Sequence, residues 1–164
     1  MMKIYSNAVF LIILLAGCQS PKKKYDFTFF KWNIRESYYL KFNSSDTLYH
    51  INTYRLEEQT SFTILDDDER ERIQIALDNL SFPKEKEFSN SLIEDGETNA
   101  FYLKDDKQYQ QLKIHGHQGP DQFWLFGKTL TNIKNQHNFM KINKKFDLSG
   151  IEKMVAPPIL FIQK

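Results

Sequence analysis

The single cysteine of this 164-residue chain, Cys18, limits how the chain can hold itself together. A chain with one cysteine forms no internal disulfide and has no cysteine pair for a zinc site. The folded part must therefore rely on a hydrophobic core. Residues 25–164 are long enough to bury such a core, and they are interpreted as one domain.

The residues before Cys18 have the layout of a secretory signal. Lys3 is followed by an apolar run from Ala8 to Leu15, and then by small residues. At about 1.5 Å per residue, this run is too short to cross a hydrocarbon core of roughly 30 Å. A positive start, a short apolar core and small residues at its end are typical of a signal peptide.

The end of this signal, Leu15-Ala16-Gly17-Cys18, resembles the lipobox of bacterial lipoproteins, which runs Leu, small residue, Gly or Ala, Cys. The resemblance implies that residues 1–17 are removed. It also implies that Cys18 carries a diacylglyceryl group and, on its new amino terminus, a further acyl chain such as palmitate. One acyl chain binds a membrane only marginally, whereas two or three hold firmly.

Residues 18–24 are interpreted as a lipidated tether, with the basic run Lys22-Lys23-Lys24. These lysines either add about 1 kcal/mol each on an anionic leaflet or only keep the tether solvated. Gln19 follows the cysteine in place of the Asp that retains some lipoproteins in the inner membrane, which favours the outer membrane. We expect a lipid-anchored protein of the cell membrane or outer membrane, with its domain periplasmic or on the surface.

Charge and motif content exclude several functions. Without Lys3, basic and acidic side chains are equal in number, so no net field favours nucleic acid. No Gly-rich phosphate loop and no Gly-x-Ser-x-Gly elbow is present. No cofactor is expected. The 14 Phe and 8 Tyr suit half-buried strands and favour a substantial sheet.

Strands dominate the first part of the domain. Residues 25–34 alternate as Tyr25, Phe27, Phe29 and then as Phe30, Trp32, Ile34, and this change of parity predicts a bulge or break. Residues 36–43 and 47–56 predict a hairpin around the turn at 43–46, and residues 61–65 a further strand.

A helix is predicted after these strands. Asp66 and Glu69 have the spacing of a capping box, so the acidic run at 66–71 is explained without a metal ion. One apolar stripe follows, and Pro83 ends the element. The stripe consists of Ile73, Ala76, Leu77 and Leu80.

The second part repeats this order. Residues 84–92 predict a loop, and residues 99–104 and 108–115 a second hairpin. Pro120 suits the first position of a helix over 121–135. The stripe of that helix is Phe123, Phe126, Gly127, Leu130 and Ile133. A short helix is expected near 148–155, and residues 159–162 as a terminal strand or packed tail.

These elements predict an α+β fold. Hairpins favour an antiparallel sheet, and two amphipathic helices are expected on one of its faces, with a short C-terminal helix. Residues 36–80 and 99–135 share the order hairpin then helix, which suggests a ββα–ββα duplication. The order of elements behind a lipobox loosely resembles small uncharacterised lipoproteins of Gram-negative bacteria, a resemblance that implies no known activity.

His115 and His117, with Asp121, form the best candidate for a metal site. Two imidazoles at i and i+2 of an extended strand point to one side, and a carboxylate could complete the ligand set, with His50 or His137 as further candidates. The alternative is a pair of exposed histidines at the end of a strand.

Trp124 and Leu125 are the candidate partner surface. Both fall roughly 120–140° from the centre of the stripe of their helix. If the helix lies on the outside of the sheet, one or both are exposed, and exposed Trp is enriched at interface hot spots. The alternative is a helix wedged between the sheet and the C-terminal segment, which would bury both residues.

A clear anchor without a convincing catalytic constellation favours a non-enzymatic domain that binds an envelope protein or has a structural role. Its partners would be the lipid bilayer, through Cys18, and a protein, but not nucleic acid. A narrower hypothesis is an immunity or inhibitor lipoprotein that acts against a periplasmic toxin or hydrolase. The competing classes are a metal-assisted hydrolase that uses His115 and His117, and a small-ligand carrier.

Overall fold

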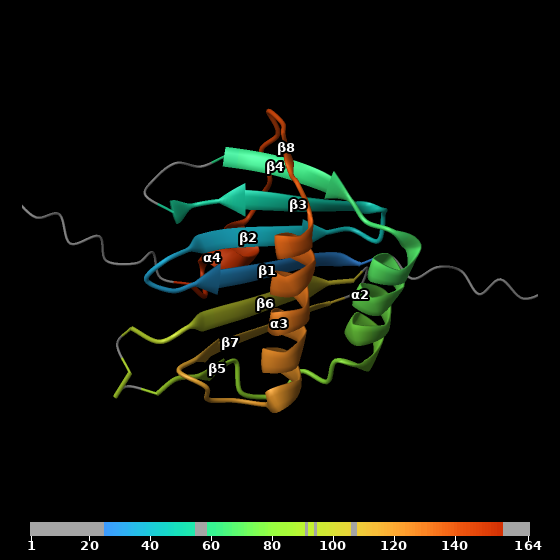
Figure 1. Ribbon diagram of the computed structural model, residues 1–164. Helices are drawn as coiled ribbons and strands as arrows, with labels where there is room; N and C mark the ends of the chain where they lie inside the picture. Colours follow the sequence, from blue (N-terminus) through green and yellow to red (C-terminus); the bar gives the residue numbers. More distant parts are fainter. Residues whose placement is uncertain (1–24, 55–58, 91, 94, 106–107, 156–164) are drawn as a thin grey trace, which may run out of the picture.

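The computed structural model describes residues 25–54, 59–90, 92–93, 95–105 and 108–155, and the signal, Cys18, the tether and residues 159–162 lie outside them. Eight strands form one mixed sheet, in the order β5-β7-β6-β1-β2-β3-β4-β8 (Figure 1). Together with the helices α2, α3 and α4, this sheet makes an α+β fold.

The central strand β1, Asp26–Trp32, shows why the sequence changes parity there. Phe27 and Phe29 belong to the core on one face of the sheet, and Phe30 belongs to the core on the other. The pairing of β1 with β2 and with β6 runs without interruption, so the predicted bulge is wrong. Both parities are apolar because both faces of this strand are covered.

Both predicted hairpins are confirmed. β2, Ser37–Phe42, pairs antiparallel with β3, Thr47–Asn52, and β6, Thr98–Lys104, pairs antiparallel with β7, Tyr109–His115. β4, Gln59–Ile64, adds to β3 on the other side. Each strand starts or ends within a few residues of the predicted position.

Two short strands were not predicted from the sequence. Residues 84–92, predicted as a loop, contain β5, Glu87–Phe88, which pairs parallel with β7 and makes the sheet mixed. β8, Met140–Lys141, pairs with β4 at the opposite edge. Two residues carry no measurable alternation, so only the tertiary structure reveals such strands.

Helix α2, Asp67–Asn79, begins with the predicted capping box. The Glu69 backbone N–H donates to Asp66 Oδ1 at 2.7 Å, and the Asp66 N–H donates to Glu69 Oε2 at 3.1 Å. Ile73 and Leu77 of the predicted stripe are fully enclosed. The helix is therefore fixed at its start by local hydrogen bonds and along its length by apolar packing.

Helix α3, Asp121–Gln136, buries all five residues of its predicted stripe. Pro120 is the N-cap residue of this helix and does not occupy its first turn, one position away from the prediction. A Cβ on Gly127 would lie 3.2 Å from Asn99 Nδ2 and 3.4 Å from the Phe29 ring. The missing side chain thus lets α3 lie close against the sheet.

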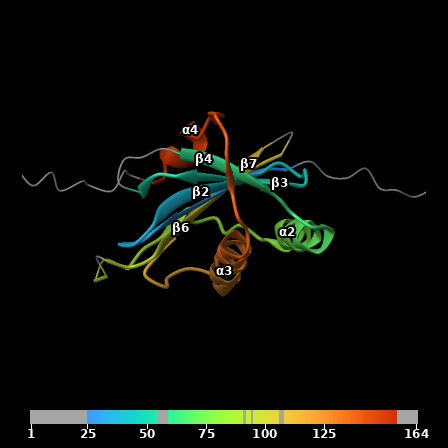
Figure 2. The same cartoon turned by 45° about the horizontal axis from the view of Figure 1, so that its top comes forward.

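Figure 2 shows α3 and α4 on opposite sides of the sheet, and an apolar core lies on each face. Residues of α2 and α3 share the larger core with Phe29 and Phe101, whose ring centroids are 5.2 Å apart. The smaller core contains Ile151 of α4, Ser149–Glu152, a helix shorter than predicted. No helix among the described residues has the length and hydropathy to cross a bilayer.

Candidate functional site

His115 ends strand β7, and both of its ring nitrogens already have partners. Nδ1 lies 2.8 Å from Thr98 Oγ1, and Nε2 lies 2.6 Å from the carbonyl oxygen of Ile93. A neutral imidazole that donates from Nε2 and accepts at Nδ1 satisfies both contacts. The lone pair that a metal ion would need is thus used within the fold.

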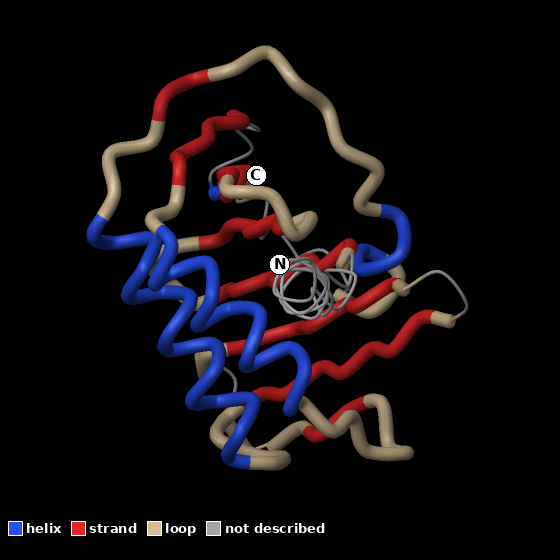
Figure 3. The backbone as a smooth tube through the Cα atoms, turned by 90° about the vertical axis from the view of Figure 1, so that its right-hand side faces the viewer, coloured by secondary structure: helices blue, strands red, loops and turns tan. Residues whose placement is uncertain are grey.

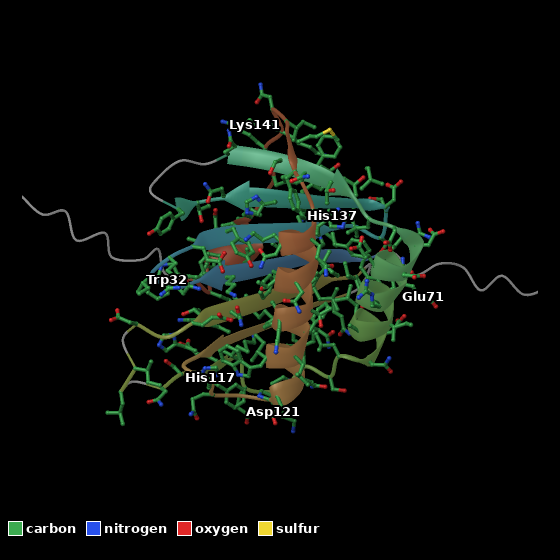
Figure 4. All side chains as sticks on the ribbon, in the orientation of Figure 1. Trp32, Glu71, His117, Asp121, His137 and Lys141 are labelled. Atoms are coloured by element: carbon green, nitrogen blue, oxygen red, sulfur yellow. The ribbon has the colours of Figure 1, made fainter. Side chains whose placement is uncertain are left out.

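The expected same-side geometry of His115 and His117 is absent. The strand stops at His115, and Gly116 and His117 both have φ near +60°. The exposed His117 ring instead packs against Trp124, with centroids 5.0 Å apart, close to Asp121 at the start of α3 (Figure 4). Within the described part of the chain, no three His, Cys, Asp or Glu side chains gather in a way that could hold a metal ion.

Trp124 is partly buried and contributes to the larger core. Its Nε1–H donates to the carbonyl oxygen of Gln118 at 2.8 Å, and His117 covers part of its ring. The indole therefore fastens the turn before α3 to the helix. The only polar side-chain atom of Trp124 is therefore already hydrogen-bonded within the chain.

Leu125 points away from the core and is 65% exposed. It lies on the rim of a groove of about 380 Å³ between α2 and α3. Four apolar and four polar residues line the groove. The apolar ones are Ala76, Leu80, Leu125 and Phe126, and the polar ones are Arg72, Asn79, Gln122 and Thr129.

Protein-binding surfaces combine apolar and polar residues in this way. Gln122 Nε2 donates to the Ser81 carbonyl at 2.9 Å and fixes one end of the groove between the two helices. Arg72 Nε donates to the Asp68 carbonyl at 3.3 Å, and its side chain has no ion-pair partner among the described residues. The groove thus offers apolar contact and one cationic group.

His137, the residue after α3, takes part in a constellation that the sequence did not reveal. Its Nδ1 lies 3.0 Å from Thr63 Oγ1, and its Nε2 lies 2.9 Å from each carboxylate oxygen of Glu69. Hydroxyl, imidazole and carboxylate follow in the order of a catalytic triad. Figure 4 places His137 at the end of α3 opposite to Asp121.

The burial of this trio favours a structural role. Thr63 is 6% exposed and Glu69 is 5% exposed, so a substrate carbonyl has no access to the hydroxyl. Glu69 also completes the capping box of α2. His137 thereby links β4, α2 and the end of α3, three elements far apart in the sequence.

A second group of charges, which we name the α3 ion network, consists of Lys31, Glu36, Glu97 and Lys134. Lys31 Nζ lies 3.4 Å from Glu36 Oε1 and 3.0 Å from Glu97 Oε2, and Lys134 Nζ lies 3.1 Å from Glu36 Oε2. Lys134 also stands 4.4 Å from the centroid of the Tyr38 ring. Two positive and two negative charges are thus balanced between the sheet and α3.

Burial and the charges of the α3 ion network together shift the pKa values of Tyr38, His50 and Glu36. Burial raises the pKa of Tyr38, and the Glu36 and Glu97 carboxylates raise it further. Burial also lowers the pKa of His50 to about 4, and the Lys134 charge adds to this shift. Burial alone would raise the pKa of Glu36, but Lys134 and Lys31 together outweigh it, so that pKa is lowered.

One atom beside the network is left unpaired. Asn99 Nδ2 donates to Glu97 Oε1 at 2.9 Å, but the buried Oδ1 of Asn99 has no hydrogen-bond partner among the described residues. Such an atom lowers stability by about 1–3 kcal/mol. The spacing of residues in the sequence does not reveal these contacts, because Lys31 and Glu97, like Glu36 and Lys134, meet only through the fold.

Comparisons of the chain with protein-family models, with curated proteins and with solved structures gave no match.

Proposed function

We propose that this chain is a lipid-anchored, non-enzymatic protein of the cell envelope that binds a partner protein through the groove between α2 and α3. The observation that carries the proposal is Leu125, which is 65% exposed beside an apolar groove. A large apolar side chain in that position is solvated unless something covers it. The partly buried Trp124 supports the surface from within its own helix.

The chemistry of the groove favours an amphipathic helix as the partner segment. Its apolar residues suit side chains spaced at i, i+3 or i+4, and the guanidinium of Arg72 suits a carboxylate. The proposal therefore requires an acidic residue beside the apolar face of the partner helix. The identity of that protein would separate a structural envelope partner from a periplasmic toxin or hydrolase that is held inactive.

Site-specific photo-crosslinking in intact cells tests the groove. A photoreactive phenylalanine derivative replaces Leu125 in one variant and Tyr109, which is 57% exposed on β7, in the control. We expect one discrete adduct from position 125 and none from position 109. Leu125→Asp should weaken binding of the partner so identified about 30-fold, since a hot-spot residue contributes about 2 kcal/mol. Equal adducts at both positions, or none, would refute the groove.

The anchor is proposed on the motif Leu15-Ala16-Gly17-Cys18 alone. Cys18→Ser removes the only thiol that could carry the diacylglyceryl group. We expect loss of labelling by an alkyne analogue of palmitate and transfer of the protein from the membrane fraction to the soluble fraction. Unchanged labelling and fractionation would exclude lipidation at this residue and leave the groove untouched.

We also propose two finer features of the fold. The two main helices lie on one face of the sheet, and the chain contains a ββα–ββα duplication. The larger core, which contains residues of both α2 and α3, supports the first idea. Hairpins β2–β3 and β6–β7, each with a helix later in the chain, support the second. In the first half β4 intervenes between hairpin and helix, which a duplication must explain as an added strand.

A further inference from the structure

The chain between β8 and α4 crosses the edge of the sheet as an arch. We name residues 141–146 the edge arch. Figure 1 shows the chain rising past β8 above β4 before it runs behind the sheet to α4, and Figure 3 shows the same loop spanning the top of the molecule. The edge arch therefore joins the face that carries α3 to the face that carries α4.

Both ends of the edge arch are fixed to the sheet. At its start, Lys141 pairs with Ser61 of β4, and the Ile142 N–H donates to the Thr60 carbonyl at 3.0 Å. At its end, the Phe146 ring packs on Tyr49 with centroids 4.7 Å apart, and Leu148 is buried just beyond. The arch is thus held at two points while its middle stands off the edge strand.

A hollow of about 540 Å³ lies between the edge arch and strand β4. The described residues that line it are neutral or cationic. They are Gln59 and Thr60 of β4 and Lys141, Ile142, Asn143, Lys144 and Lys145 of the arch. The hollow has the size of a small-molecule site, which ranges from about 300 to 1,000 Å³.

The three lysines of this wall form no ion pair among the described residues. None of Lys141, Lys144 and Lys145 makes a salt bridge with any residue that the structure describes. Three positive charges within residues 141–145 repel each other, and an anion that binds there relieves the repulsion. Because the whole chain has a net charge of only +1, the positive charge is a local feature.

Lys144 is held in position by aromatic rings. Its Nζ stands 4.3 Å from the Tyr49 centroid and 4.9 Å from the Phe146 centroid, and it donates to the Tyr49 hydroxyl at 3.0 Å. Cation–π contact leaves the remaining N–H groups of an ammonium free to donate. A fixed lysine loses less conformational entropy when it binds an anion than a freely moving one.

We propose that the edge arch binds a small multivalent oxyanion, a phosphate-bearing group that accepts hydrogen bonds from Lys141, Lys144 and Lys145. The backbone of the arch and the edge of β4 set the size of the site, and the lysines set its charge. Two sources share this chemistry, a free phosphate compound and the phosphate of a lipid headgroup. The inference is independent of the α2–α3 groove, which involves other residues.

Calorimetric titration of the full chain with inorganic pyrophosphate tests the proposal, in non-ionic detergent micelles at constant ionic strength. The test variant combines Lys141→Gln and Lys145→Gln. The matched control combines Lys84→Gln and Lys128→Gln, two exposed lysines outside the arch. We expect pyrophosphate binding to weaken about tenfold or more in the test variant, as the loss of two surface charges implies, and to stay unchanged in the control.

A second arm separates the two sources. Phosphatidylglycerol added to the micelles competes with pyrophosphate if a lipid headgroup enters the arch, and it has no effect if only a free oxyanion does. Either result supports the shared chemistry. No pyrophosphate binding to the native chain, or equal weakening in both pairs of variants, would overturn it. Tyr49→Phe, which keeps the ring and removes the hydroxyl, should weaken binding by a smaller factor.

Discussion

Lysines in two regions of this molecule meet opposite conditions. In the α3 ion network, Lys31 is 9% exposed and lies between the carboxylates of Glu36 and Glu97. In the edge arch, three lysines lie in the solvent with no carboxylate partner among the described residues. Lysine is thus a buried, paired residue in the first region and an exposed residue without an ion-pair partner in the second.

The difference shows how to separate structural from functional charge from one structure. A buried ammonium must be paired, because removal of one partner leaves a charge that water cannot reach. An exposed ammonium contributes little to stability and is free to bind something else. Substitutions in the two regions should therefore have contrasting effects on folding and on binding.

The largest effect is expected from Lys31→Ala. It removes the ammonium that pairs with Glu97 and one of the two that pair with Glu36, and it should lower the free energy of unfolding by about 2 kcal/mol. Urea denaturation followed by circular dichroism measures the change. A triple variant, Lys31→Met with Glu36→Gln and Glu97→Gln, should recover at least half of the loss. If Lys31→Ala is as stable as the native chain, the network is not structural.

The next largest effect should be a dependence of stability on pH that comes mainly from the enclosed His50. The pKa of His50 is about 4 in the folded protein against an ordinary 6.5, so the unfolded chain binds this proton first. Stability is then complete above pH 6.5 and falls as the pH drops towards 4. The lowered pKa of Glu36 removes more stability below pH 4.5.

Urea midpoints measured between pH 4 and pH 8 check this behaviour. His50→Gln should flatten the fall between pH 6.5 and pH 4, because it removes the group that titrates there. His117→Gln is the matched control, since that ring is exposed, and it should leave the profile unchanged. Identical profiles for the native chain and for His50→Gln would contradict the pH prediction.

The smallest effect on stability is expected in the edge arch. Lys141→Ala and Lys145→Ala remove exposed, unpaired charges and should change the free energy of unfolding by less than about 0.5 kcal/mol each. The same urea titrations measure it. A decrease of 2 kcal/mol or more in the free energy of unfolding would show that the arch lysines stabilise the fold. The arch lysines would then not differ from Lys31 in this respect.

Elements with strong periodicity could be predicted from the sequence, and elements without it could not. The capping box at Asp66 and Glu69 and the buried stripe of α3 could be predicted because each depends on residues within one turn or one helix. β5 and β8 could not, because two residues pair only where the tertiary structure brings a partner strand. Leu125 was found as a candidate surface residue, but the groove beside it comes from two helices.

Local spacing was enough to predict the α+β class, both hairpins, the buried faces of α2 and α3, and the motif at Cys18. That both faces of β1 are covered became clear only from the fold. The tertiary structure also decided that His137 meets Glu69 and Thr63, and that Lys141 and Lys145 line a hollow beside β4. Those contacts join residues distant in the chain, and their energies depend on burial and on opposite charge, which spacing does not encode.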